Sequence, residues 1–395
     1  MNLLVLHSEL GVLRGGGENF TRNLFSAFAG RGHGVAAAFV TSPDGRYPLP
    51  LPSVIKAIPI RGWWSSSLGA PTLSFLSRYL PPGGPYRKQW DRVQAAINWR
   101  VFAWHKRRFQ KRIEREFSDR WDHFDAVYVH GDMALASSVG CHRPTLLRLP
   151  GPVTAESAAT LKKISAVCAN GDALAQIRSF LGDYALELPV GLDTQLFKPD
   201  NSLVRSALGW GNHHHVIGYV GRLTHLKGVD LLATAIREVA GQRSNVRLLL
   251  IGSGAEEKSI RSILAKQIGQ GLVHIESDLD HAQLAQRYRA MDLLVMPSRY
   301  ENFSNALLEA MACGVPFLAS DVGGNRIMAK SGAGWLFECG SAASLATRLN
   351  EIFKDGFELK ARGKIGRDYI QNHHSWAATA EQLERIIVSR LGVER

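Results

Sequence analysis

The sequence contains few cysteines and no motif built from them. Its four cysteines, Cys141, Cys168, Cys313 and Cys339, are far apart, and no Cys-x-x-Cys pair occurs. A disulfide framework needs a denser arrangement, so the class of small disulfide-stabilised proteins is excluded. The same scarcity is typical of proteins from a reducing compartment, which predicts a cytoplasmic location.

Long apolar segments are also missing. The first residues, MNLLVLHSE, are apolar only as far as His7 and Glu9, which is shorter than the apolar part of a secretory signal peptide. No other run approaches the about 18–20 apolar residues that cross a bilayer as a helix. We therefore expect a protein that is not secreted and that contacts a membrane, if at all, peripherally at its inner face.

The glycine signatures of two nucleotide-binding classes are incomplete. The turn Gly252–Gly254 lacks the third glycine of the GxGxxG dinucleotide fingerprint. The only Gly-Lys pair, Gly363-Lys364, follows Glu358 at the position where a Walker A loop has glycine. The sequence therefore supports neither dinucleotide binding nor a P-loop.

Positive charge is present in excess, and it is local. The 395 residues carry 47 Lys and Arg against 35 Asp and Glu, a formal net charge of +12. Residues 60–121 hold thirteen basic and four acidic residues, a net of +9, together with six of the nine tryptophans. From Trp90 to Phe117 apolar residues recur every three to five positions, which predicts one helix or two broken ones carrying the cations Lys106-Arg107-Arg108. Three interpretations stay open: a solvated basic face, a surface for anionic lipid headgroups or a lipid-diphosphate acceptor, and nucleic-acid binding, for which no recognition module is visible.

Short apolar runs alternate with helical patterns along most of the chain. This alternation predicts the α/β class, with parallel sheets covered by helices in two doubly wound halves that join near residue 195. The expected strands are residues 3–6, 35–40, 126–130, 166–169, 216–220, 247–251, 272–275, 293–296 and 315–319, and the expected helices include 18–29, 229–240, 284–290 and 305–313.

Glycines and cations stand where strands end, and open α/β sheets bind their ligands there. Gly15–Gly17 follow the first strand, and glycines in that position let the backbone approach an anion closely. Arg222 and Lys227 lie between a later strand and a helix, where two cations are suited to clamp a diphosphate. The alternatives are a tight turn that needs positive φ and two solvated loop cations.

The strongest local feature is the segment from Pro297 to Pro316. Its two glutamates, Glu301 and Glu309, are separated by seven residues, the first in a loop and the second inside the following helix. A partly buried carboxylate needs hydrogen-bond partners, and ligand hydroxyls provide them. Backbone amides of residues 302–305 at the helix start are suited to face a phosphate or a sugar. The alternative is that Glu301 only caps the positive end of the helix.

Taken together, these motifs resemble those of GT-B glycosyltransferases of family 4, the retaining, nucleotide-sugar-dependent group 1 enzymes. The resemblance runs nearly end to end and implies two Rossmann-like domains facing across a cleft. Residues 1–195 would form the acceptor-side domain, with a C-terminal helix over 377–395 packing back on it, and residues 196–376 would bind the donor. The motifs are Gly16-Gly17-Glu18, Arg31-Gly32-His33-x-Val35, Gly191-Leu192-Asp193, Phe197-x-Pro199, Gly221-Arg222 with Lys227-Gly228, Gly252-Ser253-Gly254, the two glutamates, and Ser375-Trp376.

The resemblance also implies roles for individual residues. Arg222 and Lys227 would bind the donor diphosphate and stabilise the departing nucleotide, and Glu301 would bind hydroxyls of the donor sugar. His130, which ends the strand 126–130, matches the first-domain histidine that meets this sugar; a structural histidine is the alternative. Asn302-Phe303-Ser304 stands where the family usually has Gly-Phe-Gly. The implied donor-binding residues are Gly16, Gly17, Gly252, Leu279 near the base, Asn302, Phe303, Ser304, Asn305, and Glu309 at the ribose.

The implied reaction needs neither a protein nucleophile nor a metal, because the cations of residues 222 and 227 replace the metal. The nucleotide leaves and the acceptor attacks on the same face of the sugar. Asp278-Leu279-Asp280 does spell the DxD motif of metal-dependent transferases of another fold, and we expect it here to form a loop and a helix cap. His213–His215 are expected to form a solvated turn.

We therefore expect a hexosyltransferase that builds a cell-surface or envelope polysaccharide. Its partners would be a nucleotide-sugar, with UDP as the carrier that the family favours, and a glycan or lipid-linked acceptor. Peripheral membrane contact through residues 60–121 is expected, and nucleic acid is not. Two other classes stay open: a same-fold enzyme such as a sugar-nucleotide epimerase or a phosphorylase, and a non-catalytic, membrane-associated relative.

Overall fold

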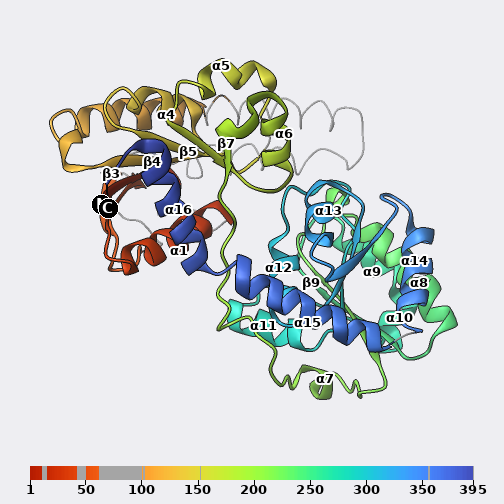
Figure 1. The fold of residues 1–395 in the computed structure, drawn as a ribbon. Coiled ribbons are helices and arrows are strands. Elements are labelled where there is room, and N and C mark those ends of the chain that lie inside the picture. The colour runs from red at the N-terminus through yellow and green to blue at the C-terminus, as the bar shows by residue number, and fades with distance from the viewer. Residues whose placement is uncertain are drawn as a thin grey trace. The chain divides into compact units, whose positions relative to one another are not determined.

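The chain is described by a computed structural model that covers residues 1–10, 16–41, 50–61, 100, 103–151, 153–354 and 356–394. Parallel strands alternate with helices along it (Figure 1). The chain divides into two compact units. The first comprises Met1–Ala169, Gln176–Leu188 and Ala380–Arg395, and the second comprises Asn170–Ala175 and Pro189–Thr379.

The first unit is built on a parallel sheet. Within the described ranges it has seven strands, in the order β3-β2-β1-β4-β5-β6-β7. The strand order reverses between β1 and β4, which pair directly with each other, so their carboxyl ends flank the point at which such sheets bind ligands. The strands are β1 (Asn2–Leu6), β2 (Gly34–Thr41), β3 (Lys56–Arg61), β4 (Ala126–His130), β5 (Thr145–Arg148), β6 (Ala166–Ala169) and β7 (Ala185–Glu187).

Helices from both ends of the sequence belong to the first unit. The last helix, α16, begins in the second unit, but its residues from Ala380 onward belong to the first, where Leu383 and Ile387 are buried. The predicted return of the final helix to the first domain is therefore confirmed. Besides helical residues 103–116, the helices are α1 (Gly16–Gly30), α4 (Met133–Val139), α5 (Ala158–Leu161), α6 (Gly171–Leu181) and α16 (Trp376–Leu391), with short 3-10 turns at Trp121–His123, Ala155–Ser157 and Gly182–Tyr184. Helix α6 belongs to this unit only from Gln176 onward.

A second parallel sheet forms the centre of the second unit. In the part of the chain that the structure describes, its strand order is β10-β9-β8-β11-β12-β13, so the order reverses between β8 and β11. The loops that follow these two strands therefore lie at the second switch point. The strands are β8 (His215–Val220), β9 (Val246–Ile251), β10 (Val273–Glu276), β11 (Leu293–Met296), β12 (Phe317–Ser320) and β13 (Gly334–Phe337).

Alternate residues of the second sheet enter two separate cores. Leu248 and Leu250 pack with α8 and α14, which lie side by side in Figure 1, whereas Leu249 and Ile251 pack with α11 and α12. A strand buried on both faces has a continuous apolar run, as Arg247–Ile251 predicted. The helices are α7 (Val204–Ala207), the 3-10 turn η5 (His225–Lys227), α8 (Val229–Gln242), α9 (Glu257–Ile263), α10 (Ala265–Gly269), α11 (His281–Arg289), α12 (Asn305–Ala312), α13 (Gly323–Ala329), α14 (Ala342–Ile352) and α15 (Gly356–His373).

The predicted α/β class with two doubly wound parallel sheets is confirmed. Strands β3, β5, β7 and β13 were not expected from the sequence. Of the predicted helix from Trp90 to Phe117, the structure describes residues 100 and 103–117, and residues 100 and 103–116 are helical. Of the described helices, none is both long and apolar enough to span a bilayer. Gly15, Trp63, Trp64, Trp90, Val93, Ile97 and Val101 lie outside the described residues.

Candidate active site

Two loops of the second unit meet at its switch point. One follows β8 and contains Lys227, and the other follows β11 and contains Ser298 and Glu301. The Lys227 Nζ donates to Glu301 Oε2 at 2.5 Å, and the Ser298 hydroxyl donates to the same oxygen at 3.3 Å. Glu301 is 7% exposed. The structure thus joins two of the predicted catalytic residues, 74 positions apart in the sequence, in one partly buried ion pair.

Close packing of these two loops depends on a glycine. Gly228 has a φ of +66°, a conformation that favours glycine, and a Cβ added to it would lie 1.9 Å from the carbonyl oxygen of Pro297. The motif Lys227-Gly228 therefore combines a cation with the glycine that lets the loop after β8 approach the loop of Glu301.

Arg222 lies in the same loop as Lys227, immediately after the end of β8. It is exposed, and it forms no ion pair with any residue that the structure describes. The Tyr219 hydroxyl donates to its carbonyl oxygen at 2.9 Å and holds the backbone. The guanidinium is thus available to an anionic ligand.

Gly252 supports this loop by packing. Its φ is +145°, and an added Cβ would lie 1.9 Å from the carbonyl oxygen of Gly221. The glycine turns after β8 and β9 therefore lie against each other. This contact explains why residue 252 is glycine, and a contact between Gly252 and a ligand stays a prediction.

Glu309 lies one helix turn inside α12 and is half-buried. The Tyr288 hydroxyl donates to its Oε2 at 2.8 Å. Burial raises the pKa of this carboxyl from 4.5 to about 7, and the hydrogen bond from Tyr288 opposes that shift. The group therefore titrates near neutrality and can exist in both protonation states under ordinary conditions.

Several polar groups at the start of α12 already have hydrogen-bond partners within the protein. Ser304 is the N-cap and accepts from the amide of Leu307 at 3.4 Å. The side-chain oxygen of Asn302 accepts from the amide of Ala173 at 2.7 Å, and its carbonyl accepts from Asp172 at 3.1 Å. These two side chains therefore have structural partners already. Phe303 packs half-buried against the α11/α12 core, Asn305 is exposed at the first position of α12, and Leu279 is half-buried beside the same core.

Two histidines lie together at the switch point of the first unit. His130 is the last residue of β4, and His7 follows β1; their rings stack with centroids 4.2 Å apart. Both are buried. Burial, and then the charges of Arg148 and Lys106, lower the pKa of His7 to about 3. Burial is also the main cause that holds the pKa of His130 well below its ordinary value, so both rings are neutral at pH 7.

Hydrogen bonds fix the orientation of His130. The hydroxyl of Thr21 donates to the carbonyl of Gly17 at 3.0 Å and accepts from His7 Nδ1 at 2.9 Å. The buried hydroxyl of Tyr128 lies 3.2 Å from His130 Nδ1 and the Thr21 hydroxyl lies 3.4 Å from the same nitrogen, so these two hydroxyls fix the Nδ1 side of the ring and Nε2 is the other ring nitrogen. A Cβ added to Gly17 would lie 2.8 Å from this Nε2. The structure thus brings predicted residues Gly17 and His130 together, and Gly16 is the first residue of α1.

Sequence reasoning missed several polar residues around this histidine pair. Arg148 ends β5, is 4% exposed, and places its guanidinium 3.7 Å from the ring centroid of Phe20. Lys106 donates to the carbonyl of Gly131 at 3.1 Å and pairs with Asp132 at 3.7 Å. His7 and Arg148 each close an apolar strand, and that position was the signal available in the sequence. Nothing in the sequence pointed to Lys106 as a neighbour of Asp132.

Two secondary predictions have different outcomes. Asp280 caps α11 in a capping box with Gln283, as the cap interpretation of the DxD motif predicted. The solvated turn predicted for His213–His215 is correct for His213, which is exposed in a turn, and wrong for the other two. His214 is 9% exposed with Nε2 2.6 Å from Arg247, and His215 already belongs to β8. Among the described residues, no three His, Cys, Asp or Glu side chains gather in a way that suits a metal ion.

Comparison with known proteins agrees with the class that the fold and these loops define, a GT-B protein with two Rossmann-like domains. Over their whole lengths, this chain and a sucrose-phosphate synthase of Thermosynechococcus elongatus superpose with a TM-score of 0.73 at 22% identity. HepE of Anabaena, solved in complex with UDP, superposes with a TM-score of 0.70 at 17% identity, covering 98% of this chain and 100% of that one.

Sequence comparison finds a family match in the second half. Residues 201–369 match the family described as glycosyl transferases group 1, which confirms the group 1 resemblance that the motifs indicated. The chain is 33% identical over 202 residues to a D-inositol 3-phosphate glycosyltransferase of Segniliparus rotundus, across 50% of this chain and 45% of the relative. It is 31% identical over 213 residues to a GDP-mannose-dependent phosphatidylinositol monomannoside mannosyltransferase of Corynebacterium glutamicum, across 51% and 55%. The chain thus spans about half the length of the curated relatives it matches.

Proposed function

We propose that the protein is a retaining hexosyltransferase of family 4. It transfers a sugar from a nucleotide-sugar to a glycan or lipid-linked acceptor in the synthesis of a cell-surface or envelope polysaccharide. The observation that carries this proposal is the ion pair of Lys227 and Glu301 at the β8/β11 switch point, within residues that match the group 1 glycosyltransferases. The reaction would take place on the cytoplasmic side of the membrane.

In this mechanism the cations act on the leaving group. Arg222 and Lys227 donate hydrogen bonds to the donor diphosphate and neutralise the charge that grows as the bond between the sugar C1 and the phosphate oxygen breaks. The acceptor hydroxyl forms its bond to C1 on the same face and passes its proton to the departing phosphate oxygen. A metal ion is then not required.

The carboxylates bind hydroxyl groups of the donor. When the diphosphate attracts the Lys227 ammonium, Glu301 gains an oxygen that accepts from hydroxyls of the sugar. One oxygen of Glu309 accepts from the Tyr288 hydroxyl, and the other oxygen accepts from the ribose hydroxyls. In the first unit, His130 Nε2 lies beside Gly17, and we assign the predicted contact with the sugar to that atom.

The similar proteins differ in the nucleotide that they bind or use. UDP is bound in a solved structure of HepE, whereas the mannosyltransferase of C. glutamicum is named as dependent on GDP-mannose. We propose UDP as the carrier, since the resemblance favours it, and a binding measurement decides between the carriers.

The test is nucleotide-sugar binding by variants of the second unit. UDP-, GDP- and ADP-sugars are screened by thermal shift, and the best ligand is titrated calorimetrically. Arg222→Ala and Glu309→Ala should each weaken binding by roughly 10–100-fold, because each removes a hydrogen bond to a charged group. The matched controls Arg237→Ala and Glu238→Ala change exposed residues of α8 and should bind like the wild type.

Three results would contradict the proposal. The first is that none of the nucleotide-sugars binds the wild type, and the second is that both site variants bind as tightly as the controls. The third is that the bound donor is epimerised while no acceptor receives the sugar, which would establish the alternative class of a same-fold epimerase.

A further inference from the structure

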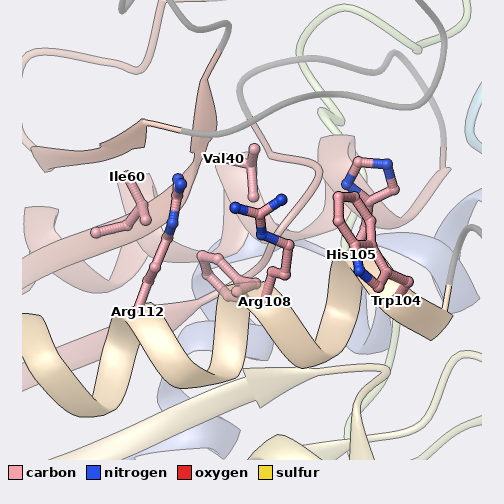
Figure 2. A pocket seen from close by; sticks show the side chains of 7 residues that line it. Val40, Ile60, Trp104, His105, Arg108 and Arg112 are labelled. Atoms are coloured by element: carbon pink, nitrogen blue, oxygen red, sulfur yellow. The ribbon is translucent and has the colours of Figure 1, made fainter. Parts of the chain in front are cut away.

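A small pocket opens in the first unit beside the basic helix of residues 103–116. Helix residues form one side, and the carboxyl ends of β2 and β3 form the other (Figure 2). Its enclosed part has a volume of about 20 Å³, and the rest is open to solvent. The lining residues are Val40, Ile60, Trp104, His105, Arg108, Phe109 and Arg112.

Within the described residues, the two arginines of this pocket have no acidic partner. Residues 103–116 contain six Lys and Arg but only Glu114 and Glu116. Glu114 accepts from the side-chain amide of Gln110 and from the hydroxyl of Ser138, and Glu116 pairs with Arg120. Among the described side chains, no carboxylate pairs with Arg108 or Arg112.

The two arginines also repel each other. They are four residues apart on one face of the helix, an arrangement of like charges that destabilises an isolated helix. Burial, and then the charges of Arg108 and Arg115, lower the pKa of Arg112. The sequence thus retains an unfavourable pair that an anion between the two guanidinium groups would relieve.

The geometry holds the arginines toward the pocket. The Arg108 guanidinium lies 4.6 Å from the ring centroid of Trp104, which orients its plane and leaves its N–H groups for another partner. Figure 2 shows the Arg108 and Arg112 side chains extending from the helix toward Val40 and Ile60. The planar N–H donors of a guanidinium group match the oxygens of a phosphate.

The pocket shares a sheet edge with the histidine pair. Val40 and Ile60 are the next-to-last residues of β2 and β3, and His130 is the last residue of β4. In the strand order, β1 alone separates β2 from β4. Two strand spacings amount to about 10 Å, which is comparable with the length of one or two sugar rings.

We propose that this pocket binds a phosphate group of the acceptor through Arg108 and Arg112. The assignment of the phosphate to an acceptor rests on the proposed function, while the phosphate site itself does not. Two sources share this chemistry: a soluble sugar phosphate and the headgroup of a phosphorylated lipid.

The test compares three variants that each remove one positive charge from the same helix. Arg108→Gln and Arg112→Gln change pocket residues, and Arg107→Gln changes an exposed neighbour that does not line the pocket. Glycerol 3-phosphate is titrated by calorimetry, and co-sedimentation is measured with phosphatidylcholine vesicles containing phosphatidic acid. We expect about tenfold or greater weakening in the two pocket variants, because charge-assisted hydrogen bonds are lost, and less than about twofold in the control.

The two probes distinguish the sources. Saturable binding of glycerol 3-phosphate that depends on Arg108 and Arg112 supports a soluble phosphate, and the same dependence seen only on vesicles supports a lipid headgroup. Binding of neither probe, or an equal loss in Arg107→Gln, overturns the phosphate site.

Nucleotide binding is measured on the same samples. If all three variants bind the nucleotide-sugar like the wild type, they are folded, and a failed phosphate test then leaves the proposed function untouched. Conversely, if the wild type binds glycerol 3-phosphate but no nucleotide-sugar, that result contradicts the proposed function and supports the phosphate site.

Discussion

At the scale of single residues, Glu309 makes donor binding depend on pH. Its pKa is raised from 4.5 to about 7, so the carboxyl is mostly protonated at pH 6 and mostly ionised at pH 8. Ribose hydroxyls donate to the ionised form. We therefore predict that the affinity for the nucleotide-sugar increases about tenfold from pH 6 to pH 8, with release of a proton on binding.

Calorimetry in buffers of different ionisation enthalpy measures both the affinity and the released proton. Glu309→Gln should bind more weakly and show no such pH dependence, whereas Glu238→Gln, on the exposed face of α8, should retain it. An affinity that stays constant in the wild type between pH 6 and pH 8 would refute the role of Glu309.

Gly228 gives a second prediction at this scale. Alanine there would need a left-handed φ and would place Cβ 1.9 Å from the Pro297 carbonyl, so the two site loops must separate. We expect Gly228→Ala to lower the free energy of unfolding by about 1–3 kcal/mol and to weaken nucleotide binding together with the Lys227–Glu301 pair.

Gly241→Ala is the matched control for this substitution. Gly241 lies in α8, and an added Cβ meets open space in the described structure. This variant should be neutral or more stable by about 0.5–1 kcal/mol, because alanine is the better helix former. Equal effects of both substitutions in urea denaturation would show that the loop contact is unimportant.

The sequence allowed the site residues to be chosen but not their partners. Lys227 and Glu301 follow apolar strands, and ligands of parallel sheets bind at such positions, so both were predicted. Their mutual contact depends on β8 and β11 being neighbours, which sequence order does not reveal. Asn302 was predicted to face a sugar, yet its side chain accepts from Ala173, a partner 129 positions away that no local pattern indicates.

At the scale of elements, a buried carboxylate adds an ion pair to the apolar packing of α16 in the first unit. Glu384 is 4% exposed and accepts from Arg31 Nη2 at 2.6 Å and from Arg31 Nε at 2.9 Å. Glu384→Ala would leave a partly buried arginine without this partner. We predict a loss of about 1–3 kcal/mol in the free energy of unfolding of the first unit.

The control for this helix is Glu381→Ala. Glu381 is exposed and pairs with exposed Arg385 at 3.8 Å, so its removal should cost about 0–1 kcal/mol. Chemical denaturation followed by tryptophan fluorescence measures both variants. Indistinguishable midpoints would mean that the Arg31–Glu384 pair contributes nothing to the docking of α16.

Elements buried on both faces could be predicted from the sequence, whereas edge and short strands could not. β4, β6 and β11 have uninterrupted apolar runs, and their predicted bounds match the structure. β3 contains Pro59 and is an edge strand with several exposed positions, so it lacks this signal. β7 has only three residues and ends in a glutamate.

At the scale of the whole molecule, each unit has its own sheet and core. We therefore predict that urea denaturation departs from a single two-state transition, as is common for chains of more than one domain. A nucleotide-sugar at about 100 times its dissociation constant should stabilise the second unit by about 2.7 kcal/mol, since binding to the folded state shifts unfolding by mass action.

A variant in one unit shows which unfolding transition belongs to that unit. Glu384→Ala should lower only the transition that the nucleotide leaves unchanged, because Glu384 belongs to the first unit. One transition that shifts as a whole with both the ligand and the substitution would show instead that the two units unfold together.

The return of α16 also determines when the first unit can finish folding during synthesis. Its other segments are complete once Leu188 has been made, but its last segment begins only at Ala380. Translation of the about 190 residues between them takes roughly 10–40 s at about 5–20 residues per second. We expect the nascent chain to expose, throughout that interval, the apolar surface that Leu383 and Ile387 later cover, and chaperones on the ribosome to bind there.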